Sequence, residues 1–188
     1  MATRLLWTLE EIGHTNVSYL DGGIAAWTTS GFDLVTDETL VKPTNYRAKR
    51  TGRTLAEKDY ILSKLGNPNT VILDTRMMEE FTNELVICDR GGNIPGAVHY
   101  NWEESIDLDN DSKLKSEKAL INVMNDLGVI PEKEIIVYCQ THLRSSHVYY
   151  VLKNIGYPKV LGYAAGYSEW GNDEQTPIEN EFINDDDE

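Results

Sequence analysis

The sequence predicts an α/β fold with a mostly parallel central sheet flanked by helices, preceded by the remnant of a second domain of the same kind. Between residues 54 and 178, short apolar runs alternate with stretches whose apolar residues recur at helical spacing. The runs at 71–73 and 135–138 have the continuous hydrophobic character of strands buried on both faces. Such alternation is typical of a parallel sheet, which binds ligands at the carboxyl ends of its strands.

The first 36 residues are expected to form a helix, a strand and a second helix. Apolar residues at helical spacing over 5–12, ended by Gly13, predict the first helix, and 17–20 predict the strand. A turn at 21–23 leads into the helix that contains Trp27. Such a unit cannot close a sheet by itself, so residues 1–36 are interpreted as the C-terminal remnant of a domain. Residues 37–53 are polar and partly basic, and we interpret them as a linker.

Residues 54–178 are interpreted as one domain, and residues 179–188 as an acidic, solvated tail. Thr54 and Glu57 have the spacing of a capping box, and Ser116 is a suitable N-cap for a helix ended by Gly128. The expected strands are 71–73, 97–100, 135–138 and 159–161, and the expected helices are 60–65, 116–127, 146–155 and 167–170.

The composition excludes several function classes. Seventeen basic and 31 acidic residues give a net charge of −14, which argues against nucleic acid or an anionic membrane as a partner. No stretch is long and apolar enough to span a membrane, and no secretion signal opens the chain, so a cytoplasmic protein is expected. The two cysteines, Cys88 and Cys139, are interpreted as reduced thiols, with Cys88 a packed structural thiol and a resolving partner as the lesser alternative.

Cys139 lies where a central strand ends, a short polar loop follows, and a helix begins near Ser146. A loop in this position turns its main-chain N–H groups inward, and the following helix adds the positive end of its dipole. Both effects favour a thiolate over a thiol. The sequence therefore predicts an anionic sulfur nucleophile at Cys139.

An internal repeat adds to this interpretation. Residues 5–27 and 148–170 both give an amphipathic helix, Ile-Gly, a short strand, a glycine-bearing turn and a closing Trp at the same spacing. The chain resembles the two-domain rhodanese family, the thiosulfate sulfurtransferases, and its loop is similar to the bacterial variant with Gln-Thr-His after the cysteine. The matching motifs are Leu73-Asp74-Thr75-Arg76, Asn93-Ile94-Pro95-Gly96-Ala97, Cys139-Gln140-Thr141-His142-Leu143-Arg144-Ser145, and Gly166 to Asn172. The resemblance covers nearly the whole chain. It also implies that the first two-thirds of the family's inactive N-terminal domain have no counterpart in this sequence.

The resemblance implies that Cys139 carries sulfane sulfur as a persulfide, from thiosulfate to cyanide or a thiol. It also implies that the loop binds the substrate through N–H groups at a position resembling an oxyanion hole. The substrate-binding residues would be Gln140, Thr141, His142, Leu143 and Arg144, with the first three lining the mouth of the site. No cofactor is expected, and no metal, because inward-facing N–H groups repel cations.

Three arginines have alternative roles. Arg144 either adds positive charge for thiosulfate or turns inward and pairs with Asp74 as a structural brace. Arg76 and Arg90 either help to bind the anion or form ion pairs with nearby acids, and ion pairing is favoured for Arg76. Asp74 and Arg76 are thus expected to support the site structurally.

Two other function classes remain open on the sequence. A phosphatase of the cysteine–arginine loop type needs one more residue between Cys139 and Arg144 than the four present here, which disfavours it. A sulfur carrier or binding module without turnover is the second alternative, because residues 1–36 are expected to be only a remnant of the N-terminal domain. The expected helix-borne His147 is interpreted as a surface or packing residue.

Overall fold

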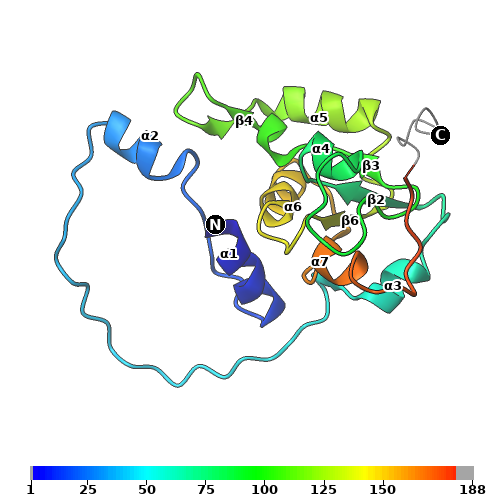
Figure 1. Ribbon diagram of the computed structural model, residues 1–188. Coiled ribbons are helices and arrows are strands. Elements are labelled where there is room, and N and C mark those ends of the chain that lie inside the picture. Colours follow the sequence, from blue (N-terminus) through cyan, green and yellow to red (C-terminus); the bar gives the residue numbers. More distant parts are fainter. Residues whose placement is uncertain (1, 181–188) are drawn as a thin grey trace.

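The computed structural model describes residues 2–180 (Figure 1). It contains a five-stranded sheet in the order β1-β7-β6-β2-β3, with every neighbouring pair parallel. The strands are β1 (Leu55–Ala56), β2 (Thr70–Asp74), β3 (Val98–His99), β6 (Glu134–Tyr138) and β7 (Val160–Tyr163). The two central strands, β2 and β6, pair along their full length, from Thr70 opposite Glu134 to Asp74 opposite Tyr138. The predicted parallel α/β sheet is confirmed.

Helices cover both faces of this sheet. The described helices of the region are α3 (Lys58–Leu62), α4 (Met78–Phe81), α5 (Glu117–Asp126), α6 (Ser145–Asn154) and α7 (Tyr167–Trp170), with a 3-10 turn at Trp102–Ser105 and a hairpin of β4 (Ile106–Asp107) and β5 (Lys113–Leu114). Alternate residues of β6 point to opposite faces: Ile135 and Val137 join a core with α5 and α6, while Ile136 joins a second core with α3 and α7. Burial on both faces explains the continuous apolar runs.

The caps expected from the sequence differ in outcome. Ser116 accepts a hydrogen bond from the N–H of Ala119 at the start of α5, at 3.4 Å, so it is the N-cap that we predicted. Thr54 does not cap α3, whose N-cap is Glu57. The Thr54 hydroxyl is buried and donates instead to the Glu11 carboxylate, at 2.6 Å. The capping-box prediction was wrong because the Thr54 hydroxyl bonds to Glu11, a residue distant in sequence, and not to the start of α3.

The N-terminal residues form α1 (Ala2–Glu11) and α2 (Gly23–Thr29), and α1 packs on α6 (Figure 1). Trp7 of α1 is buried in the same core as α6, and Lys153 of α6 pairs with Glu10. The strand expected at 17–20 is absent: these residues join no sheet of the described chain. An extended segment becomes a strand only beside a partner, and no described strand lies beside this one.

Residues 33–53 form neither helix nor strand and are exposed throughout (Figure 1). The end of this segment returns to α1, where the N–H of Thr51 donates to the carbonyl of Glu11 at 2.7 Å. Among residues 2–180, no helix is both long and apolar enough to cross a membrane.

The expected acidic tail begins at a residue that belongs to the fold. Asn93 and Glu179 exchange two main-chain hydrogen bonds of 3.0 Å, and the Glu179 carboxylate accepts from the N–H of Gly96 at 2.5 Å. Residues 181–188, the rest of that expected tail, lie outside the described residues.

Candidate active site

Cys139 directly follows β6, and α6 begins six residues later at Ser145, with the loop 140–144 between them. The site therefore lies at the carboxyl end of a central strand, where open α/β sheets bind their ligands. The Cys139 side chain is buried, with 1% of its surface exposed, and both cysteines are free thiols.

The base of this loop is pinned to α7. The carbonyls of Cys139 and Gln140 accept hydrogen bonds from the N–H groups of Tyr167 and Ser168, at 2.9 and 3.1 Å. Gly166 makes this approach possible, because a Cβ at that position would lie 2.4 Å from the Cys139 carbonyl oxygen, and its φ of +65° favours glycine. The Gly166–Trp170 motif of the sequence therefore has a local structural purpose.

With the loop carbonyls occupied in this way, its N–H groups are free. Within residues 2–180, the main-chain N–H groups of residues 140–144 donate to no acceptor. Five consecutive unpaired donors beside the first turn of α6 provide the setting in which proteins bind small anions.

The Ser145 hydroxyl contacts the thiol. It lies 3.5 Å from the Cys139 Sγ as a donor, and 2.6 Å from the Nδ1 of His142. All three side chains are buried. When Ser145 donates to a thiolate, the Nδ1–H tautomer of His142 donates to Ser145. The sequence did not predict Ser145 as a site residue; its place six residues after the cysteine, directly before the predicted helix 146–155, was the available signal.

His142 is not at the mouth of the site, contrary to the expectation from the sequence. Its imidazole is fully buried, with its ring centroid 4.6 Å from that of Trp7 in α1. Gly162 of β7 leaves room for it, since a Cβ there would lie 2.3 Å from the imidazole. Burial, together with the nearby charge of Arg4, lowers the pKa of His142 to about 3, so the ring is neutral at physiological pH. A φ of +60° at His142 turns its side chain beneath the loop.

The other loop side chains are spread over the surface of the site. Gln140 is half-buried, and its Nε2 donates to the Sγ of Cys88 at 2.8 Å, so Cys88 is packed against the loop. Thr141 is exposed, and Leu143 is 43% exposed. Leu143 and Arg144 line a cavity of about 780 Å³, whose opposite wall is formed by residues of the N-terminal segment such as Leu6 and Leu20.

Arg144 turns inward, but its partner is Glu80 and not Asp74 as one alternative had it. Both guanidinium Nη atoms bond the Glu80 carboxylate, with Nη2 to Oε1 at 2.9 Å. The hydrogen bond to Glu80 is the main reason that the pKa of Arg144 is raised. Burial favours the neutral acid, yet the Arg144 contact lowers the pKa of Glu80. The pair joins α4 to the loop, and sequence reasoning had not singled out Glu80.

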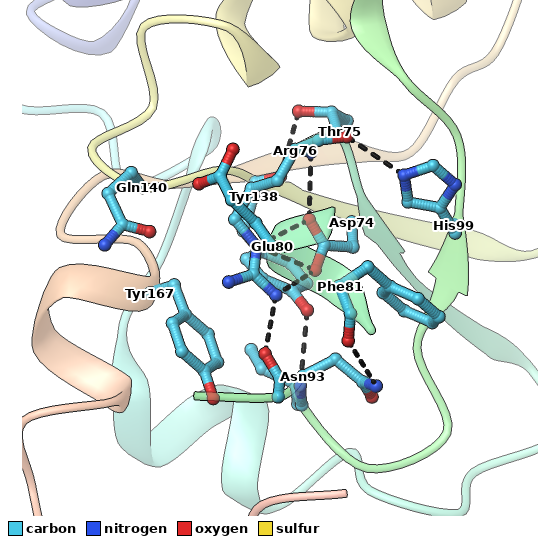
Figure 2. A network of polar contacts seen from close by, with 12 residues as sticks. Asp74, Thr75, Arg76, Glu80, Phe81, Asn93, His99, Tyr138, Gln140 and Tyr167 are labelled. Carbon is cyan, nitrogen blue, oxygen red and sulfur yellow. Dashed lines mark hydrogen bonds and ion pairs between the residues drawn. The ribbon is translucent and has the colours of Figure 1, made fainter. Parts of the chain in front are cut away.

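Asp74 instead binds Arg76, two residues along the chain (Figure 2). The Arg76 Nε and Nη2 atoms lie 3.0 and 2.6 Å from the Asp74 Oδ2, and the Nη2 also donates to the carbonyl of Gly92 at 2.8 Å. The guanidinium carbon is 4.0 Å from the centroid of the Tyr167 ring. Burial opposes the charge, but the Asp74 carboxylate holds the pKa of Arg76 above its ordinary value. The favoured prediction, an ion pair at Arg76, matches this geometry.

Arg90 also has structural partners. Its guanidinium donates to the main-chain carbonyls of Trp170 and Thr176, at 3.1 and 3.0 Å, behind α7. His147, which is predicted from the sequence to be a surface or packing residue, contacts Trp102, with ring centroids 5.7 Å apart.

The fold and the cysteine loop together define an α/β domain with a strand–loop–helix cysteine site. Residues 57–173 match the family model described as "Rhodanese-like domain", which covers more than half of the chain. The chain belongs to the rhodanese-like family.

Curated relatives agree with this assignment. The chain is similar to thiosulfate sulfurtransferases of Azotobacter vinelandii, at 35% identity over 178 residues, and of Pseudomonas aeruginosa, at 36% over 180 residues. In both comparisons 95% of this chain matches 65% of the relative, so the chain spans about two-thirds of their length. It is also 30% identical, over 94% of its length, to 66% of the sulfur carrier protein TtuD of Thermus thermophilus.

Solved structures show the same arrangement. An anaerobic ergothioneine biosynthesis enzyme from Chlorobium limicola superposes with a TM-score of 0.85 at 25% identity, over 95% of this chain and 44% of that one. A second structure with the same coverage, identity and TM-score contains EanB with ergothioneine covalently linked with a persulfide cysteine.

Proposed function

We propose that this protein transfers sulfane sulfur through a persulfide on Cys139. The observation that supports the proposal most directly is the combination of a buried thiol with five unpaired main-chain N–H groups, those of residues 140–144. Unpaired donors stabilise an anionic sulfur and any anion that approaches it. Relatives named thiosulfate sulfurtransferase favour thiosulfate as the donor.

The reaction has two displacement steps. In the first, the Cys139 thiolate attacks the outer sulfur of thiosulfate, a new S–S bond forms, and sulfite leaves with the electron pair of the broken S–S bond. In the second, cyanide or a thiolate attacks the terminal sulfur and Cys139 leaves as a thiolate. One difficult transfer is thereby split into two easier steps. Burial of Cys139 shields the persulfide from solvent between them.

The loop residues have separate roles in this proposal. Gln140, Thr141, His142, Leu143 and Arg144 bind the substrate through their main-chain N–H groups, each donor contributing on the order of 3 kcal/mol by analogy with oxyanion holes. The His142 side chain orients the Ser145 hydroxyl toward the sulfur. Asp74 and Arg76 fix the end of β2 next to the loop and do not touch the substrate.

The turnover assay separates this function from its alternatives. With thiosulfate and cyanide, we expect thiocyanate to form catalytically, at many equivalents per protein molecule. A single equivalent without turnover would instead favour a sulfur carrier, the role named for the Thermus thermophilus relative. Faster release of phosphate from an aryl phosphate than of thiocyanate from this pair would overturn the proposal in favour of a phosphatase.

The Arg144–Glu80 pair gives a further prediction. Arg144→Lys is expected to lower the free energy of unfolding by about 1–2 kcal/mol, because lysine cannot form the two parallel bonds to Glu80. Since the Glu80 carboxylate already compensates the guanidinium charge, the KM for thiosulfate should change by less than about threefold. Urea denaturation and steady-state kinetics measure the two quantities.

A double-mutant cycle provides the control. Glu80→Gln should cost a similar amount, and the double variant should cost much less than the two single losses added together. If the two losses of stability add, Arg144 and Glu80 do not act as a brace. If Arg144→Lys raises KM strongly while stability is unchanged, Arg144 contacts the substrate.

A further inference from the structure

The cationic side chains nearest in sequence to the site are already occupied. Arg76 is bonded to Asp74, and Arg144 to Glu80, each through two or more contacts. A thiolate and a doubly charged donor must nevertheless meet at Cys139, and two like charges in one place repel each other strongly. An unpaired positive charge next to the loop would relieve this repulsion.

Arg4 of α1 lies near the cysteine loop, although it belongs to the N-terminal segment. Its guanidinium carbon is 4.8 Å from the centroid of the Trp7 ring, and that ring contacts His142. The hydroxyl of Thr3, the residue before Arg4, is 3.0 Å from the hydroxyl of Ser146 in the first turn of α6. These contacts place the turn of α1 that carries Arg4 beside the cysteine loop and the start of α6.

Unlike Arg76 and Arg144, this arginine has no acidic partner. Within residues 2–180, no carboxylate forms an ion pair with Arg4, and its Nη1 atom is buried without a hydrogen-bond acceptor. Arg4 is half-buried as a residue, but a buried guanidinium nitrogen without an acceptor is costly, so the protein gains when an anion binds there.

Electrostatics connects Arg4 with the thiol. Burial lowers the pKa of Arg4, and the negative charge of the Cys139 thiolate opposes that shift. The charge of Arg4 in turn contributes to the lowered pKa of His142. The other groups that face the thiol are Arg144, whose charge Glu80 shares, the Ser145 hydroxyl and the neutral His142.

We propose that Arg4 is a substrate-binding residue, which holds the anionic end of the sulfur donor beside Cys139. The inference rests on the proposed function and assigns part of the site to the N-terminal segment. The planar fork of a guanidinium group matches the oxygen atoms of a sulfonate-like group, as it matches carboxylate and phosphate. The docking of α1 on α6 then completes the site as well as covering apolar surface.

The first test does not depend on sulfur transfer. Iodoacetate and iodoacetamide both alkylate a thiolate with loss of iodide, but only iodoacetate is an anion. At one fixed pH the ratio of their rates at Cys139, followed by peptide mass spectrometry, reports the positive charge beside the sulfur. Arg4→Gln is expected to lower this ratio about three- to tenfold. Arg4→Lys, which retains the charge, should leave it nearly unchanged.

The matched control is Arg47→Gln, which removes an exposed arginine of the 37–53 segment and should leave the ratio at its wild-type value. Thermal melting verifies that each variant is folded. If Arg4→Gln does not fold, steady-state kinetics of Arg4→Lys provides the test. Lysine lacks the planar guanidinium group, so this variant should raise the KM for thiosulfate about three- to tenfold with kcat nearly unchanged.

The outcomes separate this inference from the proposed function. A lowered alkylation ratio in Arg4→Gln with no persulfide in the wild type would retain the anion site and overturn sulfur transfer. Persulfide formation with a wild-type ratio and a wild-type KM in both Arg4 variants would retain sulfur transfer and overturn the role of Arg4.

Discussion

Cys139→Ser is expected to abolish sulfur transfer from thiosulfate to cyanide, with a loss of turnover of at least about 10³-fold. A serine hydroxyl is almost entirely protonated at neutral pH and cannot store sulfane sulfur, so no alternative nucleophile remains in the loop. The volume change is small, and the side chain is buried against Ser145, so the fold should be retained. Thiocyanate formation measures the loss, and thermal melting verifies the fold.

Cys88→Ser is the matched control, because Cys88 is the other thiol of the chain and contacts the loop through Gln140. A serine oxygen can still accept the hydrogen bond of the Gln140 amide, so most of the activity should remain. Loss of activity in Cys88→Ser together with retained activity in Cys139→Ser would move the nucleophile to position 88 and contradict the account.

Asp74→Ala is expected to have the largest effect on stability, lowering the free energy of unfolding by about 3–5 kcal/mol. The substitution removes the carboxylate that compensates the buried guanidinium of Arg76, and both side chains are almost fully inaccessible to water. It also frees the N–H of Arg76, which donates to Asp74 at 3.0 Å. Urea denaturation measures the change.

The partly exposed pair of Lys113 and Asp111 provides the control, since the two charges lie 3.7 Å apart with about a third of each side chain exposed. Lys113→Ala should cost less than about 1 kcal/mol. Pairing Asp74→Ala with Arg76→Met should recover part of the loss, because the unpaired charge is then removed. Equal costs for the buried and the exposed variants would show that the Asp74–Arg76 pair does not brace the end of β2.

Sequence patterns were sufficient to predict the sheet and the place of the cysteine. Apolar runs that are buried on both faces leave little choice of structure, and the run that precedes Cys139 became β6. The start of α6 was predicted within one residue, because Val148, Val151 and Leu152 recur at helical spacing.

Side-chain direction and partner choice were not predictable in the same way. His142 takes a left-handed backbone conformation that turns its ring under the loop, which no spacing reveals. Arg144 bonds Glu80, which is 64 residues away in sequence, whereas Asp74 is occupied by its near neighbour Arg76. Such choices depend on tertiary geometry.

The role of the N-terminal segment was also hidden from the sequence. Its expected strand at 17–20 failed because strand formation needs a neighbour in the sheet. Arg4 drew no attention because it stands 135 positions before the cysteine, so only the packing of α1 on α6 brings it to the loop.

The central claim is that the thiol at position 139 accepts and holds sulfane sulfur. The most direct test is intact-mass measurement of the folded protein after incubation with thiosulfate, followed by peptide mapping under non-reducing conditions. The account predicts one added sulfur atom, located on Cys139 and removed by cyanide. A folded protein whose mass does not change, or whose added sulfur is located on Cys88, would contradict it.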